Sequence, residues 1–505
     1  MTARLQESYE QGLRLSRQGR HADAIDCYQR ALGEAPSDPR ILFALGNTAR
    51  TLGMIQPAEM FFRQVLAIEP GRVEALINLA NLLRANGQPQ AAQALLTPAL
   101  ERNPEASEIW QTLGSVFRDM QDLAGAETHY RQALAFAPNS AVALSNLADL
   151  LAMRGENDAA LAHYDRALRA EPDSAQTRLN RSILRLQLGD LKDGWRDYAA
   201  RLKIPGKAPL CDHKLPAWAG ASLKQKRLLV TAEQGVGDQL MFASLIPDLA
   251  RRAAQEGGSI ILECEPRLVP LFARSFPDVT VHASEMQMLG GTVQAHYGWL
   301  KSLGGANLAV EMGTLPRYLR NDIAKFPQSH AYLDADEIEI LDWTKSLNDA
   351  EDGPFIGICW RSGKMTDGRA QQFAPLQAWA DFIRDLPGAP VCVQYDATED
   401  EIEELCALSG LEIVVLDDID QKQELDRACA LLSSLDAVVS APTAVSWLAA
   451  GAGVPTYKIQ RDAGWTSFGC GYEPLAPSCQ SIVPSSPGDW ADCFAKAKAA
   501  LSSQF

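Results

Sequence analysis

Residues 107–140 read Ser107-Glu-Ile-Trp-Gln-Thr-Leu-Gly-Ser-Val-Phe117, Arg118-Asp-Met-Gln-Asp-Leu-Ala-Gly-Ala126 and Glu127-Thr-His-Tyr-Arg-Gln-Ala-Leu-Ala-Phe-Ala-Pro-Asn-Ser140. This arrangement returns every 34 residues between Leu5 and about Lys203. Small residues let paired helices approach closely, aromatic side chains fill the gap between pairs, and proline ends the second helix. The pattern therefore predicts an array of helical hairpins. The shared slots are Gly12, Gly46, Ala80, Gly114 and Ala148; Ala24, Ala58, Ala92, Ala126 and Ala160; Tyr28, Phe62, Leu96, Tyr130 and Tyr164; and Pro36, Pro70, Pro104, Pro138 and Pro172.

These slots resemble the tetratricopeptide repeat (TPR), because one register holds over five copies. A sixth, degenerate copy starts at Ala175 and keeps Gly189 and Tyr198. It has Gly194 in the alanine slot and Arg201 in the next slot, 34 residues after Ala167. Terminal repeats deviate because they meet solvent or another domain. We expect residues 1–204 to form an α-solenoid of about five and a half to six repeats, with the last copy as a joint.

After the linker at 205–225 the sequence pattern changes, and buried strands alternate with amphipathic helices. This alternation predicts parallel sheets. The predicted fold class is α plus α/β, with Rossmann-like domains at 226–352 and 353–488 and a C-terminal helix, 489–505, crossing back to the first of them. The expected strands are Arg227–Ala232, Ser259–Cys264, Val279–His282, Phe355–Trp360, Val391–Tyr395, Glu412–Leu416, Ala437–Ser440 and Thr456–Ile459.

Charge and cysteine content narrow the function classes. The first 204 residues carry 23 basic and 24 acidic side chains, and the remainder carries 24 and 39. An acidic second half argues against nucleic acid as a partner, because phosphate backbones bind basic surfaces. The ten cysteines are scattered without a C-x-x-C pair, which is typical of reduced cytoplasmic thiols. No apolar leader or membrane span is evident, and no metal site is expected.

Gly235-Val-Gly-Asp238 follows the first expected strand. Glycines there allow close approach of a ligand, and a helix start offers free N–H groups to an anion. Gly235 and Gly237 are therefore candidate donor-binding residues, and Asp238 is a candidate base for an attacking hydroxyl. The alternative is that Asp238 only caps the helix.

Two further strand ends carry candidate anion-binding residues. The first is Trp360-Arg-Ser-Gly-Lys-Met-Thr-Asp-Gly-Arg369, in which cations can neutralise a leaving phosphate. The second is Ser440-Ala-Pro-Thr-Ala-Val-Ser-Trp447, where Thr443 and Ala444 start a helix. The alternatives are a solvated basic loop and a simple helix cap. The candidates are Trp360, Arg361, Ser362, Lys364 and Arg369, together with Thr443 and Ala444.

The stretches Leu188-Gly-Asp-Leu-x-x-Gly-Trp-x-x-Tyr198 and Trp218-x-Gly220…Glu233-Gln-Gly-Val-Gly-Asp-Gln239 resemble bacterial TPR-fused glycosyltransferases. Those enzymes are similar to the heptosyltransferase and O-GlcNAc-transferase branches of the GT-B fold. The resemblance spans nearly the whole chain and implies a GT-B-like pair of domains and metal-independent sugar transfer. Further matches are Leu315-Pro316, Gly357-x-x-Trp360, Asp367-x-Arg369, Gln394, Leu435-Asp436, Thr443 and Gly453-Val-Pro455.

One departure bears on the donor. Relatives carry Asp-Thr-x-x-x-His after the fourth strand, whereas this chain has Pro442-Thr-Ala-Val-Ser-Trp447. This form is similar to transferases that modify flagellin with nonulosonic acids such as pseudaminic acid in alphaproteobacteria. That resemblance implies a CMP-linked donor, with UDP and ADP donors as alternatives. In this mechanism Asp238 deprotonates a Ser or Thr of the acceptor, and Gln394 joins the donor-binding residues.

Polar residues of the repeats are candidates for acceptor binding. An asparagine ladder can bind a peptide backbone because the amide both donates and accepts; packing within the repeat is the alternative. His296 is a further candidate, with an ordinary loop histidine as its alternative. The ladder comprises Asn47, Asn78, Asn81, Asn146 and Asn180.

Three functions remain open on the sequence. The first is a cytoplasmic protein O-glycosyltransferase whose TPR arm binds the acceptor, expected to be flagellin. The second is an inactive TPR/GT-B scaffold, favoured by Pro442 and Trp447. The third is a transferase acting on lipid or polysaccharide, disfavoured by the negative charge and by the lack of a basic amphipathic helix. Fold alone does not decide among them, because function resides in the site.

Overall fold

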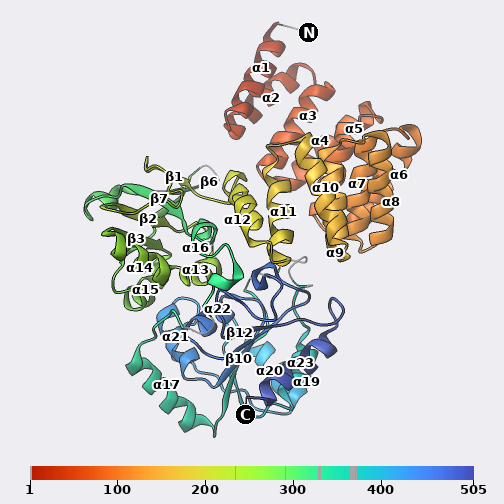
Figure 1. The fold of residues 1–505 in the computed structure, drawn as a ribbon. Coiled ribbons are helices and arrows are strands. Elements are labelled where there is room, and N and C mark those ends of the chain that lie inside the picture. The colour runs from red at the N-terminus through yellow and green to blue at the C-terminus, as the bar shows by residue number, and fades with distance from the viewer. Residues whose placement is uncertain are drawn as a thin grey trace. The chain divides into compact units, whose positions relative to one another are not determined.

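The computed structural model describes residues 3–233, 235–289, 292–327, 331–363, 365, 370 and 372–504. They form two compact units, Met1–Thr177 and Arg178–Phe505 (Figure 1). The repeat pattern continues past this division, so most of its sixth copy belongs to the second unit. The predicted boundary at residue 204 follows the end of the repeat pattern instead.

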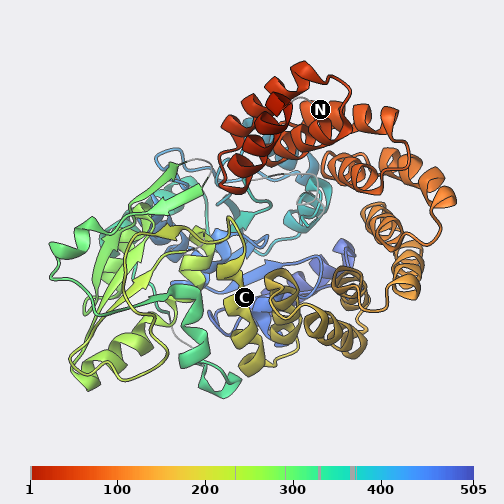
Figure 2. The same ribbon diagram turned by 90° about the horizontal axis from the view of Figure 1, so that it is seen from above.

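The first unit is an array of antiparallel helix pairs, which Figure 2 shows following a curved path. Each second helix ends two residues before the proline of its repeat, as at Ile68 and Pro70, because proline cannot continue the helix. The helices are α1 (Ala3–Arg17), α2 (His21–Glu34), α3 (Pro39–Thr51), α4 (Ile55–Ile68), α5 (Val73–Ala85), α6 (Pro89–Arg102), α7 (Ser107–Asp119), α8 (Leu123–Phe136), α9 (Ala141–Met153) and α10 (Asn157–Ala170).

Glycine in the first helix accommodates the aromatic ring of the second. A Cβ built on Gly12 would lie 2.5 Å from the Tyr28 ring, and one built on Gly46 would lie 2.7 Å from the Phe62 ring. Real Cβ atoms do not approach so closely, so these rings require glycine opposite them. The alanine slot, from Ala24 onward, is fully buried in the five full repeats. The predicted packing of the repeats is therefore confirmed.

The second unit begins within α11 (Ala175–Gln187) and continues through α12 (Leu191–Tyr198) and the 3-10 turn η1 (Ala199–Lys203). Two parallel sheets and one small mixed sheet follow. The strands are β1 (Leu210–Cys211), β2 (Arg227–Thr231), β3 (Ser259–Cys264), β4 (Thr280–Ala283), β5 (Met286–Leu289), β6 (Thr292–Ala295), β7 (Leu308–Glu311), β8 (Phe355–Cys359), β9 (Ala389–Cys392), β10 (Ala437–Ser440), β11 (Thr456–Ile459) and β12 (Cys479–Ile482).

The two larger sheets have strand orders β4-β3-β2-β7 and β12-β11-β10-β8-β9. We call them the N-terminal sheet and the C-terminal sheet. One hydrophobic core joins a face of each, from Leu228 and Val230 to Val438 and Ala449. The accompanying helices are α13 (Val236–Ala243), α14 (Ile246–Glu256), α15 (Val269–Ser275), α16 (Pro316–Leu319), α17 (Glu337–Ala350), α19 (Leu376–Ile383), α20 (Glu399–Ser409), α21 (Leu425–Ser433), α22 (Ala444–Gly451) and α23 (Trp490–Ser502).

Two expectations about elements were wrong. The segment Glu412–Leu416 is not a strand of the sheet, and only Val414 bridges to Val391. Of its five side chains only Ile413 is buried, so little packing holds the segment along the sheet. The helix α23 does not cross back to the N-terminal sheet. Its buried face, which includes Phe494, packs instead against Trp379 and Phe382 beside the C-terminal sheet.

Candidate functional site

Asp238 lies in the first turn of α13, which begins immediately after the N-cap residue Gly235. Its carboxylate accepts a hydrogen bond from the backbone N–H of Gly235. This contact is consistent with the alternative that Asp238 caps the helix. Burial raises the pKa of Asp238 above its ordinary value, and the charges of Arg201 and Lys207 oppose that rise. A carboxyl with a raised pKa is suited to accept a proton near neutral pH.

The start of α13 packs against the start of α22, which Thr443 caps through Val445 N–H at 3.3 Å. A Cβ on Gly237 would lie 3.7 Å from Ala444 Cα and 3.8 Å from Trp447 Cδ1. The predicted residues Gly237 and Ala444 are therefore neighbours, although they are far apart in the sequence. Two helix N-termini meet where the carboxyl ends of both parallel sheets face one another. Such ends offer unpaired N–H groups to an anion.

Gln394 joins the ends of β8 and β9. Its Oε1 accepts hydrogen bonds from the backbone N–H of Trp360 at 3.0 Å and of Arg361 at 2.9 Å, and its Nε2 donates to Tyr395 O at 2.7 Å. Cys359 Sγ lies 3.5 Å from both Gln394 Oε1 and Thr443 Oγ1. The structure thus brings together Trp360, Gln394 and Thr443, all buried, at one edge of the C-terminal sheet.

The loop after β8, from Trp360 to Arg369, differs from the prediction in the part that the structure describes. The Arg361 guanidinium forms two hydrogen bonds of 2.5 Å with Glu401 in α20 and another of 2.8 Å with Asp396 O. This charge is therefore already balanced within the protein. Ser362 is buried beside it. Lys364 and Arg369 lie outside the described residues.

A pocket of about 590 Å³ opens at the carboxyl end of β9, next to Gln394. Its wall also includes the segment from Val415 to Glu424, which the sequence analysis did not assign to the site. No local pattern in this segment indicates a site, and only the order of strands along the sheet could have placed it beside β9. Residues lining the pocket include Gln394, Tyr395, Asp396, Ile402, Asp417 and Gln421.

Trp447, at the position where the resemblance to transferases predicts histidine, covers a buried cation. Lys458 Nζ lies 4.8 Å from the centre of the indole and is ion-paired with Glu473. Glu473 also accepts a hydrogen bond from Ser481 Oγ at 2.6 Å. The indole contacts Lys458 on one side and lies near Gly237 on another. Trp447 therefore packs between α13 and β11.

His296 lies apart, at the end of β6. Its Nδ1 is 3.2 Å from Asp212 Oδ2, and Asp212 Oδ1 accepts the backbone N–H of Tyr297 at 2.9 Å. Behind it, the Tyr297 hydroxyl donates to the buried carboxyl of Glu263 at 2.9 Å. Burial raises the pKa of Glu263 to about 7. The sequence analysis missed Glu263 because a single Glu in a β-strand gives no signal of its environment.

The asparagines of the first unit lie on the first helices of the repeats. Asn78 Nδ2 donates to Asn47 Oδ1 at 2.8 Å across neighbouring repeats, and Asn81 accepts from Arg84 at 2.9 Å. Asn146 is half-buried on α9. Asn180 belongs to the second unit. The amides of Asn47 and Asn78 thus satisfy one another in part and retain further donor and acceptor capacity.

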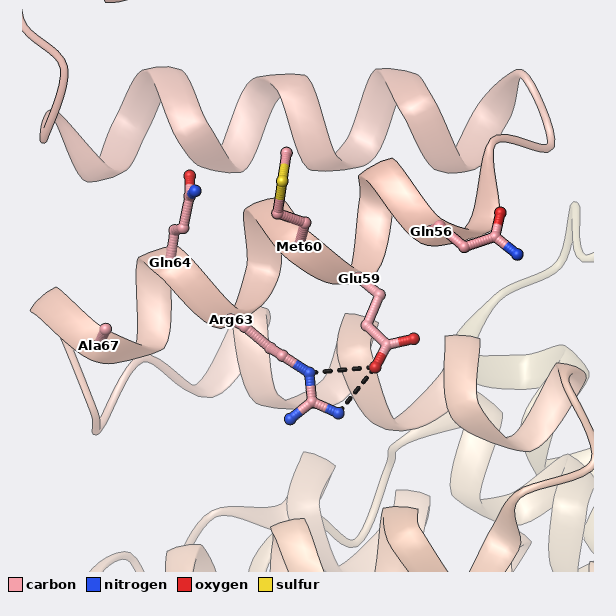
Figure 3. A pocket seen from close by; sticks show the side chains of 6 residues that line it. All are labelled: Gln56, Glu59, Met60, Arg63, Gln64 and Ala67. Atoms are coloured by element: carbon pink, nitrogen blue, oxygen red, sulfur yellow. Dashed lines mark hydrogen bonds and ion pairs between the residues drawn. The ribbon is translucent and has the colours of Figure 1, made fainter.

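A second open surface lies on α4. Figure 3 shows this shallow pocket of about 540 Å³, in which Arg63 pairs with Glu59 at 2.7 Å beside Met60. It is formed by the second helix of a repeat and is therefore separate from the asparagines.

Among the described residues, no group of three or more His, Cys, Asp or Glu is arranged to hold a metal ion. No helix in that same part of the chain combines the length and apolarity needed to span a membrane.

Known sequences and structures resemble the chain as follows. Sequence profiles described as tetratricopeptide repeat match residues 49–115, 105–173, 9–72 and 145–209, so the chain carries TPR repeats. Protein FlbA of Caulobacter vibrioides is 31% identical over 323 residues, which are 64% of this chain and 54% of FlbA. The chain thus spans about half the length of this curated relative.

Two solved structures are among those that resemble part of the chain. A thermophilic TPR protein of Thermus thermophilus is 27% identical, with a TM-score of 0.33, and the match covers 36% of this chain and 99% of that one. The pilF protein of Pseudomonas aeruginosa is 23% identical, with a TM-score of 0.33, over 39% of this chain and 89% of that one.

Proposed function

We propose that this chain is a protein O-glycosyltransferase: its second unit transfers a sugar from a nucleotide-sugar donor to a Ser or Thr of a protein bound by its TPR repeats. The observation that carries the proposal is the packing of the first turn of α13, with Asp238, against the first turn of α22. This contact lies at the carboxyl ends of two parallel sheets, where α/β proteins bind their ligands.

The proposed reaction uses two groups of this site. Asp238 takes the proton of the acceptor hydroxyl, and the hydroxyl oxygen forms a bond to the anomeric carbon of the donor. The bond from that carbon to the phosphate oxygen breaks, and its electron pair leaves on the phosphate. Backbone N–H groups at the start of α22, after Thr443, stabilise the departing charge.

The donor is proposed to be a CMP-linked nonulosonic acid, as the resemblance around Pro442 and Trp447 implies. The pocket beside Gln394 offers space for the nucleoside. A thermal-shift series with CMP, UDP, ADP and GDP tests this choice, because a ligand that binds the native state raises the unfolding temperature. Stabilisation by UDP or ADP but not CMP would reject the CMP assignment and keep a transferase.

The protein acceptor is proposed on the basis of the TPR repeats, which commonly bind peptide segments in a groove. Flagellin is the acceptor implied by the resemblance to flagellin-modifying transferases. Lipid and polysaccharide acceptors are the competing class. Incubation of the enzyme and CMP-linked donor with flagellin, followed by mass spectrometry of the protein, decides between them.

Replacement of the base tests the reaction itself. We expect Asp238→Asn to lower kcat by about 10²–10⁴-fold while nucleotide-induced stabilisation is retained, because the amide cannot accept the proton. The measurement is initial rate of sugar transfer at saturating donor.

Asp278→Asn is the matched control, since Asp278 is an exposed residue of the same half and should leave the rate unchanged. Full activity in Asp238→Asn would remove Asp238 as the base. An inactive wild type that also binds none of the nucleotides would favour the scaffold alternative, which the engagement of Arg361 by Glu401 also supports.

A further inference from the structure

The degenerate sixth repeat places a charged side chain inside the α/β unit. Arg201, in η1, is only 5% exposed. Its Nε donates to Glu233 Oε1 at 3.0 Å, its Nη2 to Thr314 Oγ1 at 3.0 Å and its Nη1 to Tyr198 O at 3.3 Å. The guanidinium also lies 4.6 Å from the centre of the Tyr198 ring. Its planar fork is thereby fixed in one orientation.

The partner carboxyl is fixed equally well. Glu233 is 9% exposed, and its Oε1 also accepts the backbone N–H of Gly313 at 3.2 Å. A Cβ on Gly313 would lie 2.7 Å from Glu233 Oε1 and 3.0 Å from Arg201 Nη2. The chain after β7 can therefore approach this ion pair only because it has glycine there. Glu233 Oε2 is buried and has no hydrogen-bond partner among the described residues.

This ion pair lies at the strand ends that precede the candidate base. The neighbouring strands β2 and β7 end at Thr231 and Glu311, which are paired in register. Glu233 follows β2, and Asp238 lies in the first turn of the helix that comes next. Arg201 is thus held at the carboxyl edge of the N-terminal sheet.

The stability of the fold does not by itself explain why the Arg201–Glu233 ion pair is buried here. Burying two charges costs about as much free energy as their attraction returns, and apolar replacements are often as stable. The same unit contains a comparable pair, Arg320 with Asp248 at 2.9 Å. Arg320 donates to Ser244 O at 2.7 Å, beyond the C-terminal end of α13, and so lies at the opposite end of the helix from Asp238.

We infer that Arg201 is a positioning residue for the proposed transfer reaction: its ion pair with Glu233 holds the end of β2 so that α13 presents Asp238 to the acceptor hydroxyl. The inference rests on the proposed function and adds a part played by the degenerate sixth repeat in catalysis. The charge of Arg201 also lowers the pKa of Asp238, against burial, which raises it. Among the described residues, the groups that also act on these carboxyls include Lys207 and Gly235 N–H at Asp238, and Glu311 and Gly313 N–H at Glu233.

The test compares variants of the full-length protein. In Arg201→Met we expect kcat to fall about tenfold with little change in the acceptor KM. The acid limb of the kcat/KM profile should move up by about one pH unit, because a neighbouring positive charge favours the ionised carboxyl. Arg320→Met, the matched control, removes a buried arginine at the other end of α13 and should leave the acid limb where it is in the wild type. An unmoved limb in Arg201→Met, or the same movement in Arg320→Met, overturns the inference.

A second variant covers the case in which Arg201→Met does not fold. Arg201→Lys keeps the charge but loses the fork, so we expect a lower kcat with the acid limb unmoved. If a folded Arg201→Lys protein has the wild-type kcat, Arg201 is not a positioning residue.

A measurement without substrate separates this inference from the proposed function. The free energy of unfolding is followed against pH for the wild type and Asp238→Asn, each with and without Arg201→Met. Because the folded-state pKa of Asp238 is raised, its stabilising contribution is present at low pH and is lost as pH rises through that pKa. Loss of Arg201 should move this transition up by about one pH unit. No movement overturns the Arg201 inference even if transfer is observed.

Discussion

At the residue scale, Glu263 is the buried carboxyl whose titration is expected near neutral pH. It accepts hydrogen bonds from Tyr297 Oη at 2.9 Å and Ala232 N–H at 3.0 Å, while Oε1 is buried and has no partner among the described residues. Burial and, to a smaller extent, the charge of Glu285 raise its pKa to about 7, although both hydrogen bonds lower it. The folded chain therefore holds this proton more tightly than the unfolded chain does.

The sign of the pH dependence follows. The stabilising contribution of Glu263 is fully present below about pH 4.5, the ordinary pKa of Glu, and is lost as pH rises through about 7. The loss amounts to about 3 kcal/mol. We expect Glu263→Gln, which cannot ionise, to remove this fall in the free energy of unfolding between pH 5 and 8, measured by urea titration.

Glu265→Gln, two residues further along the chain, is the control and should keep the wild-type pH dependence. A Glu263→Gln protein that still loses about 3 kcal/mol over that range would show that another group causes the fall.

Candidate residues differ in how far the sequence could predict them. The positions of Asp238, Gln394 and Thr443 at strand ends could be predicted, because strand–turn–helix signals fix which end of a sheet a residue occupies. The pairing of Arg361 with Glu401 could not, because 40 residues separate the two and no local spacing relates them. Arg201 did give a signal: it stands 34 residues after Ala167, at a repeat position that holds alanine in Ala31, Ala99 and Ala133.

At the scale of elements, the contact between α22 and β11 depends on Trp447. The side chain is 9% exposed and covers Lys458, whose partner Glu473 is fully buried. Trp447→Ala should destabilise the protein by about 3–5 kcal/mol, because it leaves a cavity beside a buried ion pair. Trp447→Phe should cost clearly less, because a ring still faces the ammonium. Differential scanning calorimetry measures both, and equal losses would exclude a part for the ring.

Element boundaries show the limits of periodicity. The apolar pattern from Gln239 to about Arg252 predicts a single helix, but the structure has two, α13 and α14, separated at Ser244–Leu245. Pro247 at the start of α14 fits a new helix, since proline is tolerated in a first turn. Both helices are buried toward the same core, so the apolar pattern continues across the break and conceals it. The short strands β1, β5 and β6 lack the sustained alternation that would have predicted them.

At the scale of the whole molecule, acceptor binding and nucleotide binding are proposed for different units. Asn47→Ala combined with Asn78→Ala removes the amide pair joined at 2.8 Å. We expect acceptor affinity to fall about tenfold, the effect of losing one or two hydrogen bonds, while nucleotide-induced stabilisation stays unchanged. Affinity is measured by isothermal titration with the acceptor protein.

Asn86→Ala is the control for that experiment, because Asn86 is exposed at the end of α5 in the same repeat. Wild-type affinity in the double variant would assign acceptor binding to another surface, such as the one on α4 in Figure 3.

The repeat architecture was the part of the fold most completely predictable, because each slot such as Gly46 or Ala58 is set by contacts within its own hairpin. The parallel sheets were predictable as a class, but the order of their strands was not, since order depends on pairing between distant segments.

The final hairpin has a consequence for how such chains can vary. Because most of the sixth copy, with Arg201, belongs to the compact unit of the sheets, the first unit can gain or lose hairpins in steps of 34 residues while the Arg201–Glu233 pair stays intact. Each inserted copy would need only its two neighbours for support. The number of repeats in the first unit can therefore change without any change to the residues of the candidate site. Duplication of a hairpin alone would lengthen the surface that the repeats offer to a partner.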